Sequence, residues 1–246
     1  MIILVDGHSI AFRAFYALPD TLVTTDGFPT NVIHGFLMSI SKLVKDYDSE
    51  KIIITWDISK KTFRTELYGD YKGNRSSAPD EFKLQVKVLQ KLLDKFNIPQ
   101  VSKEGFEADD VVGTLSKKLN EQSKDVMIVT GDRDSFQLIT DKTDILYTKR
   151  GISDTQIFNE KQFIEKYSIR TNQYIEYLAL KGDPSDNIPG LPGVGEKTAI
   201  NLLLKYENIT NIYKNINDLT PKLKETFSVN RDLLDISKVL ATIKQD

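Results

Sequence analysis

The chain has 246 residues, of which 40% are hydrophobic and 28% charged, the composition of an ordinary globular domain or of one domain with a smaller companion. The formal net charge is −2 and cysteine is absent, which excludes disulfides, thiol catalysis and thiolate metal sites. No apolar run approaches the roughly 18 residues that a membrane span requires. We therefore expect a cytoplasmic protein with neither a signal peptide nor a membrane segment.

Short apolar runs that end in acidic residues are the first feature met along the chain. They are residues 2–5 before Asp6, residues 52–56 before Asp57, and residues 126–130 before Gly131 and Asp132. Runs of this length without alternation are typical of strands covered on both faces, as in the parallel sheets of α/β folds.

Segments with helical spacing of apolar residues alternate with these runs. The predicted helices are 9–17, 31–45, 82–96 and one that follows Glu107, and residues 145–148 are a further predicted strand. This order predicts an α/β domain with a mostly parallel sheet. Strand signals fade after about residue 160, so we expect the α/β domain over 1–165 and a smaller helical domain over 166–246.

Nine acidic residues fall in five places along the chain. They are Asp6, Asp57, Glu107 with Asp109 and Asp110, Asp132 with Asp134, and Asp183 with Asp186. Open parallel sheets bind ligands beyond the carboxyl ends of their strands, so the pattern gathers acids along one edge of one sheet. So many carboxylates cannot all stay ionised side by side without cations, which predicts divalent metal. The alternatives are helix capping for one or two of the acids at 107–110 and a simple turn at 132–134.

Residues 182–199 form the most specific segment, G-D-P-S-D-N-I-P-G-L-P-G-V-G-E-K-T-A. Its second half is a glycine-rich hairpin that opens onto a predicted helix over 198–206. Glycines there let the backbone approach a phosphate, and amides at a helix N-terminus bind anions. A nucleotide P-loop does not fit, because Glu196 separates Gly195 from Lys197. A loop that grips a nucleic-acid backbone without reading bases fits better.

Residues 60–75 combine basic and aromatic side chains. These are Lys60, Lys61, Phe63, Arg64, Tyr68, Tyr71, Lys72 and Arg75. Cations attract phosphates and rings stack on unpaired bases, whereas the alternative is a solvated amphipathic helix. The position directly after Asp57 favours contact with substrate. We interpret His8, near the acids, as a structural residue or one that supports a ligand.

Five motifs occur in one order along the chain. They are V-D-G at 5–7, F-R-x-x-x-Y-x-x-Y-K-x-x-R at 63–75, E-A-D-D at 107–110, G-D-x-D at 131–134 and G-D-x-S-D-N-I-P-G-x-x-G-x-G-x-K-T-A at 182–199. With these motifs the chain resembles the 5′-nuclease family of bacterial flap endonucleases, most closely the 5′→3′ exonuclease domains of DNA polymerases I. The resemblance implies a PIN/resolvase-like sheet with flanking helices, a basic arch at about 60–80, and a helix–two-turn–helix (helix-hairpin-helix-like) DNA clamp at about 175–210.

The resemblance also implies a reaction and the residues that carry it. The reaction is hydrolysis of DNA, and of RNA primers, near 5′ ends and flap junctions in replication and repair, with two or more Mg²⁺ ions that Mn²⁺ can replace. One metal group corresponds to Asp6, Asp57, Glu107, Asp109, Asp110, Asp132 and Asp134, and a second to Asp183 and Asp186. Lys72 would act in catalysis beside Asp6, Asp57 and Asp132. The implied DNA contacts are Arg64, Tyr71, Lys72, Arg75, Gly193, Val194, Gly195, Lys197 and Thr198, with K⁺ at the 190–198 loop.

The implied partners are DNA with a 5′ flap, a 5′ overhang or a nick, an RNA primer paired with DNA, and a DNA polymerase fused to the chain or acting with it. We expect a monomer and no membrane partner. A PIN-type ribonuclease, a non-catalytic DNA-binding paralogue and a metal-dependent phosphatase are the alternatives. The balance of exonuclease and endonuclease activity, and of DNA and RNA, stays open at this point.

Overall fold

The computed structural model describes residues 1–59, 61–150 and 154–246. The chain divides into two compact units, each considered by itself: unit 1 comprises Met1–Lys60, Ser77–Asn159 and Lys244–Asp246, and unit 2 comprises Lys61–Ser76 and Glu160–Ile243. In the part of the chain that is described, none of the helices combines the length and apolar character needed to cross a bilayer.

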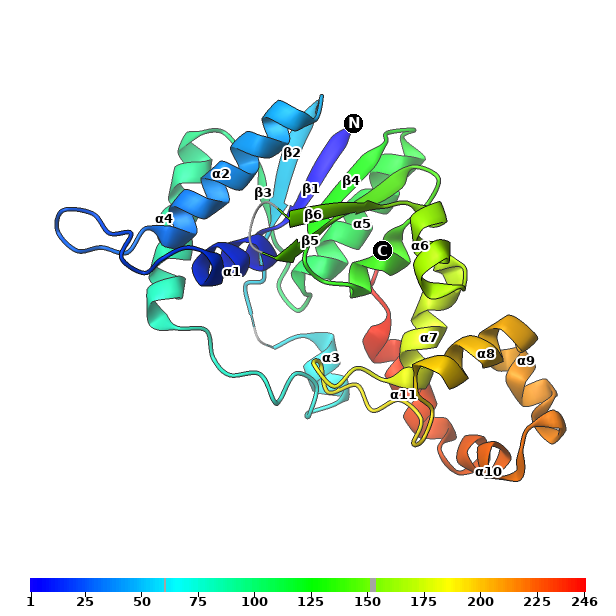
Figure 1. The fold of residues 1–246 in the computed structure, drawn as a ribbon. Helices are drawn as coiled ribbons and strands as arrows, with labels where there is room; N and C mark the ends of the chain where they lie inside the picture. Colours follow the sequence, from blue (N-terminus) through cyan, green and yellow to red (C-terminus); the bar gives the residue numbers. More distant parts are fainter. Residues whose placement is uncertain (60, 151–153) are drawn as a thin grey trace. The chain divides into compact units, whose positions relative to one another are not determined.

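Unit 1 is built on one six-stranded sheet with the order β3-β2-β1-β4-β5-β6 (Figure 1). The strands are β1 (Ile2–Asp6), β2 (Lys51–Thr55), β3 (Gln100–Val101), β4 (Val126–Thr130), β5 (Thr143–Arg150) and β6 (Asp154–Phe158). β1 to β5 pair in parallel, and β6 pairs with β5 antiparallel. The predicted, mostly parallel sheet is therefore confirmed. β3 and β6 were not predicted from the sequence.

Helices cover both faces of this sheet. They are α1 (Gly7–Ala17), α2 (Asn31–Asp46) and α4 (Asp80–Lys95), which share one apolar cluster with the sheet, and α5 (Ala108–Glu121), which contacts β1, β2 and β4. In the cluster, Val5 and Val129 of neighbouring strands pack with Phe36 and Leu89, all of them at most 3% exposed. Residues alternate between the faces of a strand, so buried Leu4 points to the opposite face from Val5.

β1 and α1 follow each other without a loop, and Asp6 joins them. Its backbone ends β1, and its side chain caps α1 by accepting a hydrogen bond of 3.0 Å from the Ser9 amide. The next residue must be small, because a Cβ on Gly7 would lie 2.6 Å from the Trp56 ring. The first strand–helix junction thus fixes a carboxylate at the carboxyl end of the sheet.

Unit 2 is helical. Its helices are α3 (Phe63–Leu67), α6 (Glu160–Tyr167), α7 (Tyr174–Lys181), α8 (Glu196–Tyr206), α9 (Ile209–Lys214), α10 (Pro221–Val229) and α11 (Arg231–Ala241). α7 packs against α11, and rings of Phe163, Tyr167, Tyr174 and Tyr177 stack or meet edge to face. The helical character predicted for the C-terminal part is confirmed.

The segment 61–76 packs within unit 2, although the sequence predicted the basic arch as part of the α/β domain. Arg64 explains this difference. Its Nε donates to the Leu240 carbonyl at 2.9 Å and its Nη2 to the Thr242 carbonyl at 2.7 Å. The last carbonyls of a helix lack intrahelical partners, so the guanidinium satisfies the C-terminal end of α11.

Two glycines make the loop after α7 possible. Gly182 and Gly190 have φ of +75° and +63°, and a Cβ on Gly190 would lie 2.4 Å from the Gly182 nitrogen. The Gly190 amide also donates to the Ser237 hydroxyl at 3.0 Å, which fastens the loop to α11. A side chain at Gly190 would therefore meet both backbone strain and a backbone clash.

We expect Gly190→Ala to lower the free energy of unfolding by about 3 kcal/mol, because a left-handed conformation and overpacking add. Urea denaturation followed by circular dichroism measures the change. Gly69→Ala is the matched control, since a Cβ there meets no atom within 4 Å. An equal effect of the two substitutions would contradict the strain argument.

Candidate functional site

Three carboxylates stand at the carboxyl ends of adjacent strands in unit 1. Asp6 ends β1, Asp57 follows β2 and Asp132 follows β4, in the order β2-β1-β4 within the sheet. Burial raises the pKa of Asp6 to about 6, and the negative charges of Asp57 and Asp132 raise it as well, against hydrogen bonds from Ser9 and Thr130 that lower it. Asp57 and Asp132 therefore each lie close enough to Asp6 to repel its charge.

Asp57 links the end of β2 to the start of α5. One carboxylate oxygen accepts a hydrogen bond of 2.7 Å from the Ala108 amide, and the other lies 3.4 Å from Nδ1 of His8. The same Nδ1 accepts a bond of 3.2 Å from the Asp57 amide, and the His8 ring meets Trp56 edge to face at 5.2 Å. His8 thus supports Asp57 from the side of α1.

The acids at the start of α5 cap the helix. Glu107 and Asp110 form a reciprocal capping box, with Asp110 Oδ2 accepting from the Glu107 amide at 3.0 Å. Asp110 is 2% exposed, and its Oδ1 accepts from the Lys244 amide at 2.8 Å. The capping alternative therefore describes Glu107 and Asp110, and Asp109 lies between them in the first turn.

Asp132 and Asp134 belong to a turn that hydrogen bonds stiffen. Asp132 Oδ1 accepts from the Asp134 amide at 2.9 Å, and the Asp132 amide donates to the Thr130 hydroxyl at 3.0 Å. That hydroxyl lies 3.0 Å from Asp6 Oδ2 and donates to it. Thr130 therefore connects Asp6 with Asp132. The segment is therefore a turn, as the alternative predicted. Its acids still lie at the carboxyl edge of the sheet.

Arg13 supports the same turn and was missed from the sequence. Its Nη2 donates to the Gly131 carbonyl at 3.3 Å and its Nη1 to the Lys149 carbonyl at 2.8 Å. A Cβ on Gly131 would lie 2.3 Å from the guanidinium. The glycine before Asp132 was the only trace of this contact in the sequence.

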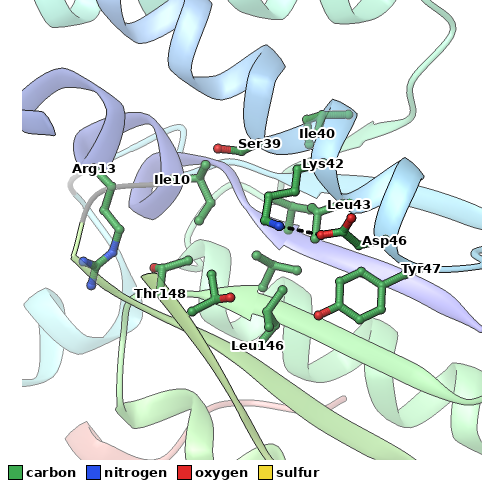
Figure 2. Close-up of a pocket in the computed structure, with 13 residues that line it drawn as sticks. Ile10, Arg13, Ser39, Ile40, Lys42, Leu43, Asp46, Tyr47, Leu146 and Thr148 are labelled. Atoms are coloured by element: carbon green, nitrogen blue, oxygen red, sulfur yellow. Dashed lines mark hydrogen bonds and ion pairs between the residues drawn. The ribbon is translucent and has the colours of Figure 1, made fainter. Parts of the chain in front are cut away.

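Arg13 also lines a cavity of about 80 Å³ between α2 and the sheet (Figure 2). Its walls include Leu43, Leu146 and Tyr47, with the ion pair of Lys42 and Asp46 at 2.5 Å. None of the nine acids is among its described lining residues. The cavity and the predicted metal site are therefore different places in unit 1.

The donor set in unit 1 fits a hard divalent cation. Within residues 1–59, 61–150 and 154–246, no group of three or more His, Asp or Glu side chains is arranged to hold an ion by direct contact. Mg²⁺ usually binds through one or two carboxylates and keeps several waters, so direct ligation by three side chains is not required. A cation beside Asp6 would relieve the repulsion that its raised pKa records.

The predicted second metal group is arranged differently, in unit 2. Asp183 accepts two hydrogen bonds of 2.8 Å from the amide and hydroxyl of Ser185. Asp186 is 3% exposed, and cationic side chains face both of its oxygens: Arg75 forms an ion pair with Oδ1, and Lys72 Nζ lies 3.5 Å from Oδ2. In this arrangement two cationic side chains compensate the charge of Asp186, and a metal ion at Asp183 and Asp186 stays a prediction.

Two predicted DNA contacts are buried. The Arg64 side chain is bonded to helix carbonyls and Arg64 is 2% exposed, while Tyr71 is 5% exposed with its hydroxyl 3.4 Å from Asp186. Each is held inside unit 2 by a partner distant in sequence, and contact of either residue with DNA stays a prediction. Lys72 and Arg75 remain partly exposed, and Lys60 lies outside the described residues.

The predicted clamp loop is exposed at its glycines. Gly193, with φ of +75°, and Gly195 are surrounded by open space, and Lys197 is exposed in the first turn of α8. α8 begins at Glu196, two residues before the predicted start. Val194 is 3% exposed, so its side chain belongs to the core. Thr198 is partly buried in the first turn of α8.

Comparison with known proteins assigns both parts of the chain. The family model of the 5′–3′ exonuclease N-terminal resolvase-like domain matches residues 1–168, and that of the 5′–3′ exonuclease C-terminal SAM fold matches residues 169–246. DNA polymerase I of Bacillus subtilis is 40% identical over 247 residues, covering 100% of this chain and 28% of that protein. The chain thus spans about a quarter of the length of the curated relatives it matches.

Solved structures share the fold. The T5 5′-exonuclease with bound zinc has a TM-score of 0.77 at 23% identity, covering 98% of this chain and 88% of that one. A variant of the T5 D15 flap endonuclease, in a pseudo-enzyme-product complex with DNA and metal ions, has a TM-score of 0.78 at 24% identity, with the same coverage. These likenesses confirm the resolvase-like fold with a helical C-terminal part.

The raised pKa of Asp6 predicts a pH-dependent stability. Below about pH 4 Asp6 is protonated in the folded and the unfolded chain, and between about pH 4 and 6 only the unfolded chain ionises, so stability falls. Above about pH 6 the whole penalty is present. Asp6→Asn cannot ionise and should be more stable than the unsubstituted chain by up to about 3 kcal/mol near pH 8 and by little near pH 4.

Thermal unfolding in EDTA across this pH range measures the effect. Asp144→Asn is a useful comparison, because burial also raises the pKa of that carboxyl, which lies in β5 away from the three strand ends. A stability difference for Asp6→Asn that did not change between pH 4 and pH 8 would contradict the crowding of the three carboxylates.

Proposed function

The chain belongs to the 5′–3′ exonuclease family, and on that premise we propose that it is a divalent-metal-dependent 5′ nuclease. It would hydrolyse phosphodiester bonds of DNA near 5′ ends and at the junctions of 5′ flaps. The observation that carries the proposal is the position of Asp6, Asp57 and Asp132 at the carboxyl ends of three adjacent strands, where Asp57 and Asp132 both repel the charge of Asp6. Such a set suits the binding of a cation next to a phosphate.

The residues that would hold the metal are Asp6, Asp57 and Asp132, with the acids of 107–110 and Asp134 around them. Mg²⁺ is the expected ion because it prefers carboxylate oxygen. When bound, Mg²⁺ supplies an activated water and stabilises the charge of the leaving oxygen. The protein's own part is to orient the carboxylates, through Thr130 between Asp6 and Asp132.

Lys72 would neutralise charge that develops on the phosphate, the electrostatic part of the transition state. Its amine has the exposure this needs, with 22% of the side chain accessible. Arg75, half exposed in the same turn, would bind a neighbouring phosphate.

The 190–198 loop would hold the duplex through its backbone. Open space around Gly193 and Gly195, the first-turn amides of α8 and exposed Lys197 suit phosphate contacts that carry no base specificity. The T5 flap endonuclease structure with DNA and metal ions supports this proposal by the likeness of fold. K⁺ at this loop, cleavage of RNA primers, and a monomeric state stay predictions from the resemblance.

The first test is cleavage of a labelled 5′-flap duplex with Mg²⁺ and with EDTA, mapping the product ends. We expect Mg²⁺-dependent cuts near the flap junction, and Asp132→Ala should lower kcat by at least about 100-fold. Binding of the same duplex, measured by fluorescence anisotropy in EDTA, should change little. Full activity of Asp132→Ala would refute the assignment, and preferred cleavage of single-stranded RNA would favour a PIN-type ribonuclease.

Lys197→Ala should weaken duplex binding and make it less sensitive to salt. Each phosphate contact contributes about 0.9 to the slope of log affinity against log salt, so the slope should fall by about that amount. Lys205→Ala provides the control, because Lys205 is exposed at the other end of α8. Equal slopes for the two variants would argue against the 190–198 loop as the clamp.

A further inference from the structure

The turn over 70–75 is bound to the loop over 183–188 by contacts that run along both segments. The Lys72 amide donates to the Asp186 carbonyl at 2.9 Å, and Asn74 Nδ2 donates to the Pro184 carbonyl at 2.8 Å. In the reverse direction, Asn187 Nδ2 donates to the Asp70 carbonyl at 2.8 Å. Both segments belong to unit 2, so this contact is part of its own fold.

The Asp186 carboxylate is the buried centre of this contact. Arg75 pairs with Oδ1, and the Tyr71 hydroxyl and Lys72 Nζ lie 3.4 and 3.5 Å from Oδ2. A carboxylate that is only 3% exposed requires such partners, because an uncompensated buried charge is strongly destabilising. Lys72 and Arg75, the two basic residues of the facing turn, thus compensate the charge of Asp186.

The backbone of the turn needs this support. Lys72 has φ of +54°, a left-handed conformation that a residue with a long side chain adopts at a cost. Such conformations persist where surrounding contacts over-determine them. The ion pairs to Asp186 and the hydrogen bond from the Lys72 amide are the contacts that fix this conformation. They also orient the Lys72 amine toward Asp186.

We propose that Asp186 is a positioning residue for Lys72 and Arg75, in addition to any role it has toward a metal ion. It would hold the turn over 70–75 in its strained form before substrate arrives, so that two cations are already aligned for phosphates. The effect of this role on catalysis rests on the proposed function. The docking of the turn on Asp186 does not. The sequence motif alone pairs Asp186 with Asp183, whereas the described contacts pair it with the basic turn.

Limited trypsin digestion of the full chain in EDTA, without DNA, tests the geometry. Lys72 and Arg75 are themselves trypsin sites, and a peptide bond is cut only when its segment leaves its docked form. Asp186→Asn should accelerate cleavage after these residues at least about tenfold, as expected for breaking a buried ion pair. Cleavage after Lys205 in α8, which belongs to the same unit, serves as an internal reference for the integrity of the fold of unit 2.

Asp183→Asn is the matched control, because it removes the neighbouring acid but keeps an oxygen for Ser185. It should leave cleavage after Lys72 within about twofold of the unsubstituted chain. The proposal would be overturned if trypsin cut after Lys72 and Arg75 equally slowly in the unsubstituted chain and both variants. It would also be overturned if both variants were cut equally fast. If Asp186→Asn does not fold, Arg75→Met is tested in its place, with Lys61→Met as its control. Trypsin cleavage of the Lys72–Gly73 bond is then the readout.

Binding of the 5′-flap duplex in EDTA, where no metal ion contributes, then separates a positioning role from a merely structural one. If Asp186 acts through Lys72 and Arg75, adding Asp186→Asn to the double variant Lys72→Ala, Arg75→Ala should not weaken this binding further. A further loss of affinity would overturn the positioning role. An unsubstituted chain that cuts no flap, together with trypsin exposure in Asp186→Asn, would refute the proposed nuclease function and leave the docking of the turn intact.

Discussion

Repulsion among carboxylates at the carboxyl edge of the sheet is the constraint on which the site in unit 1 depends. Parallel pairing of β2, β1 and β4 brings three strand ends side by side, and each strand has an aspartate at its end or just beyond it. Asp6 lies in the middle and is 7% exposed, so it bears both the cost of burial and the charges of its neighbours. The chain holds this charge in place with the Ser9 amide and the Thr130 hydroxyl, which orient the carboxylate without neutralising it.

In unit 2, a buried carboxylate is compensated by positive charge. Asp186 is less exposed than Asp6, yet two cationic side chains of the same unit face it. The charge of Asp186 is therefore compensated by side chains of its own unit. In unit 1, an amide and a hydroxyl donate the hydrogen bonds that hold Asp6. This contrast explains why we propose a metal ion at the strand ends and add a positioning role for Asp186.

Much of this could be predicted from the sequence, because apolar runs and helical spacing are local signals. β1, β2, β4 and the helices α1, α2, α4 and α5 follow from them, as does the edge where the acids gather. β3 has only two residues and β6 is largely polar, so neither gives a signal that stands out. α8 starts at Glu196 because Gly195, an acceptable N-cap, precedes it.

The burial of Arg64 and Tyr71 could not be predicted, since basic and aromatic residues in a polar stretch resemble a surface. The carbonyl that binds Arg64 Nε is 176 residues away in the sequence, and Asp186 is 115 residues from Tyr71. Such pairs become visible only when the chain is folded. The same applies to Arg13, whose contact with Gly131 spans 118 residues.

The most direct test of the central claim is an anomalous difference map from a crystal of the protein soaked in Mn²⁺. We predict a peak at the carboxyl edge of the sheet, within ligand or water-mediated distance of Asp6, Asp57 and Asp132. We also predict that the peak is lost in Asp6→Asn. A Mn²⁺ peak only at Asp183 and Asp186, or none in the presence of ordered strand-end carboxylates, would contradict the claim.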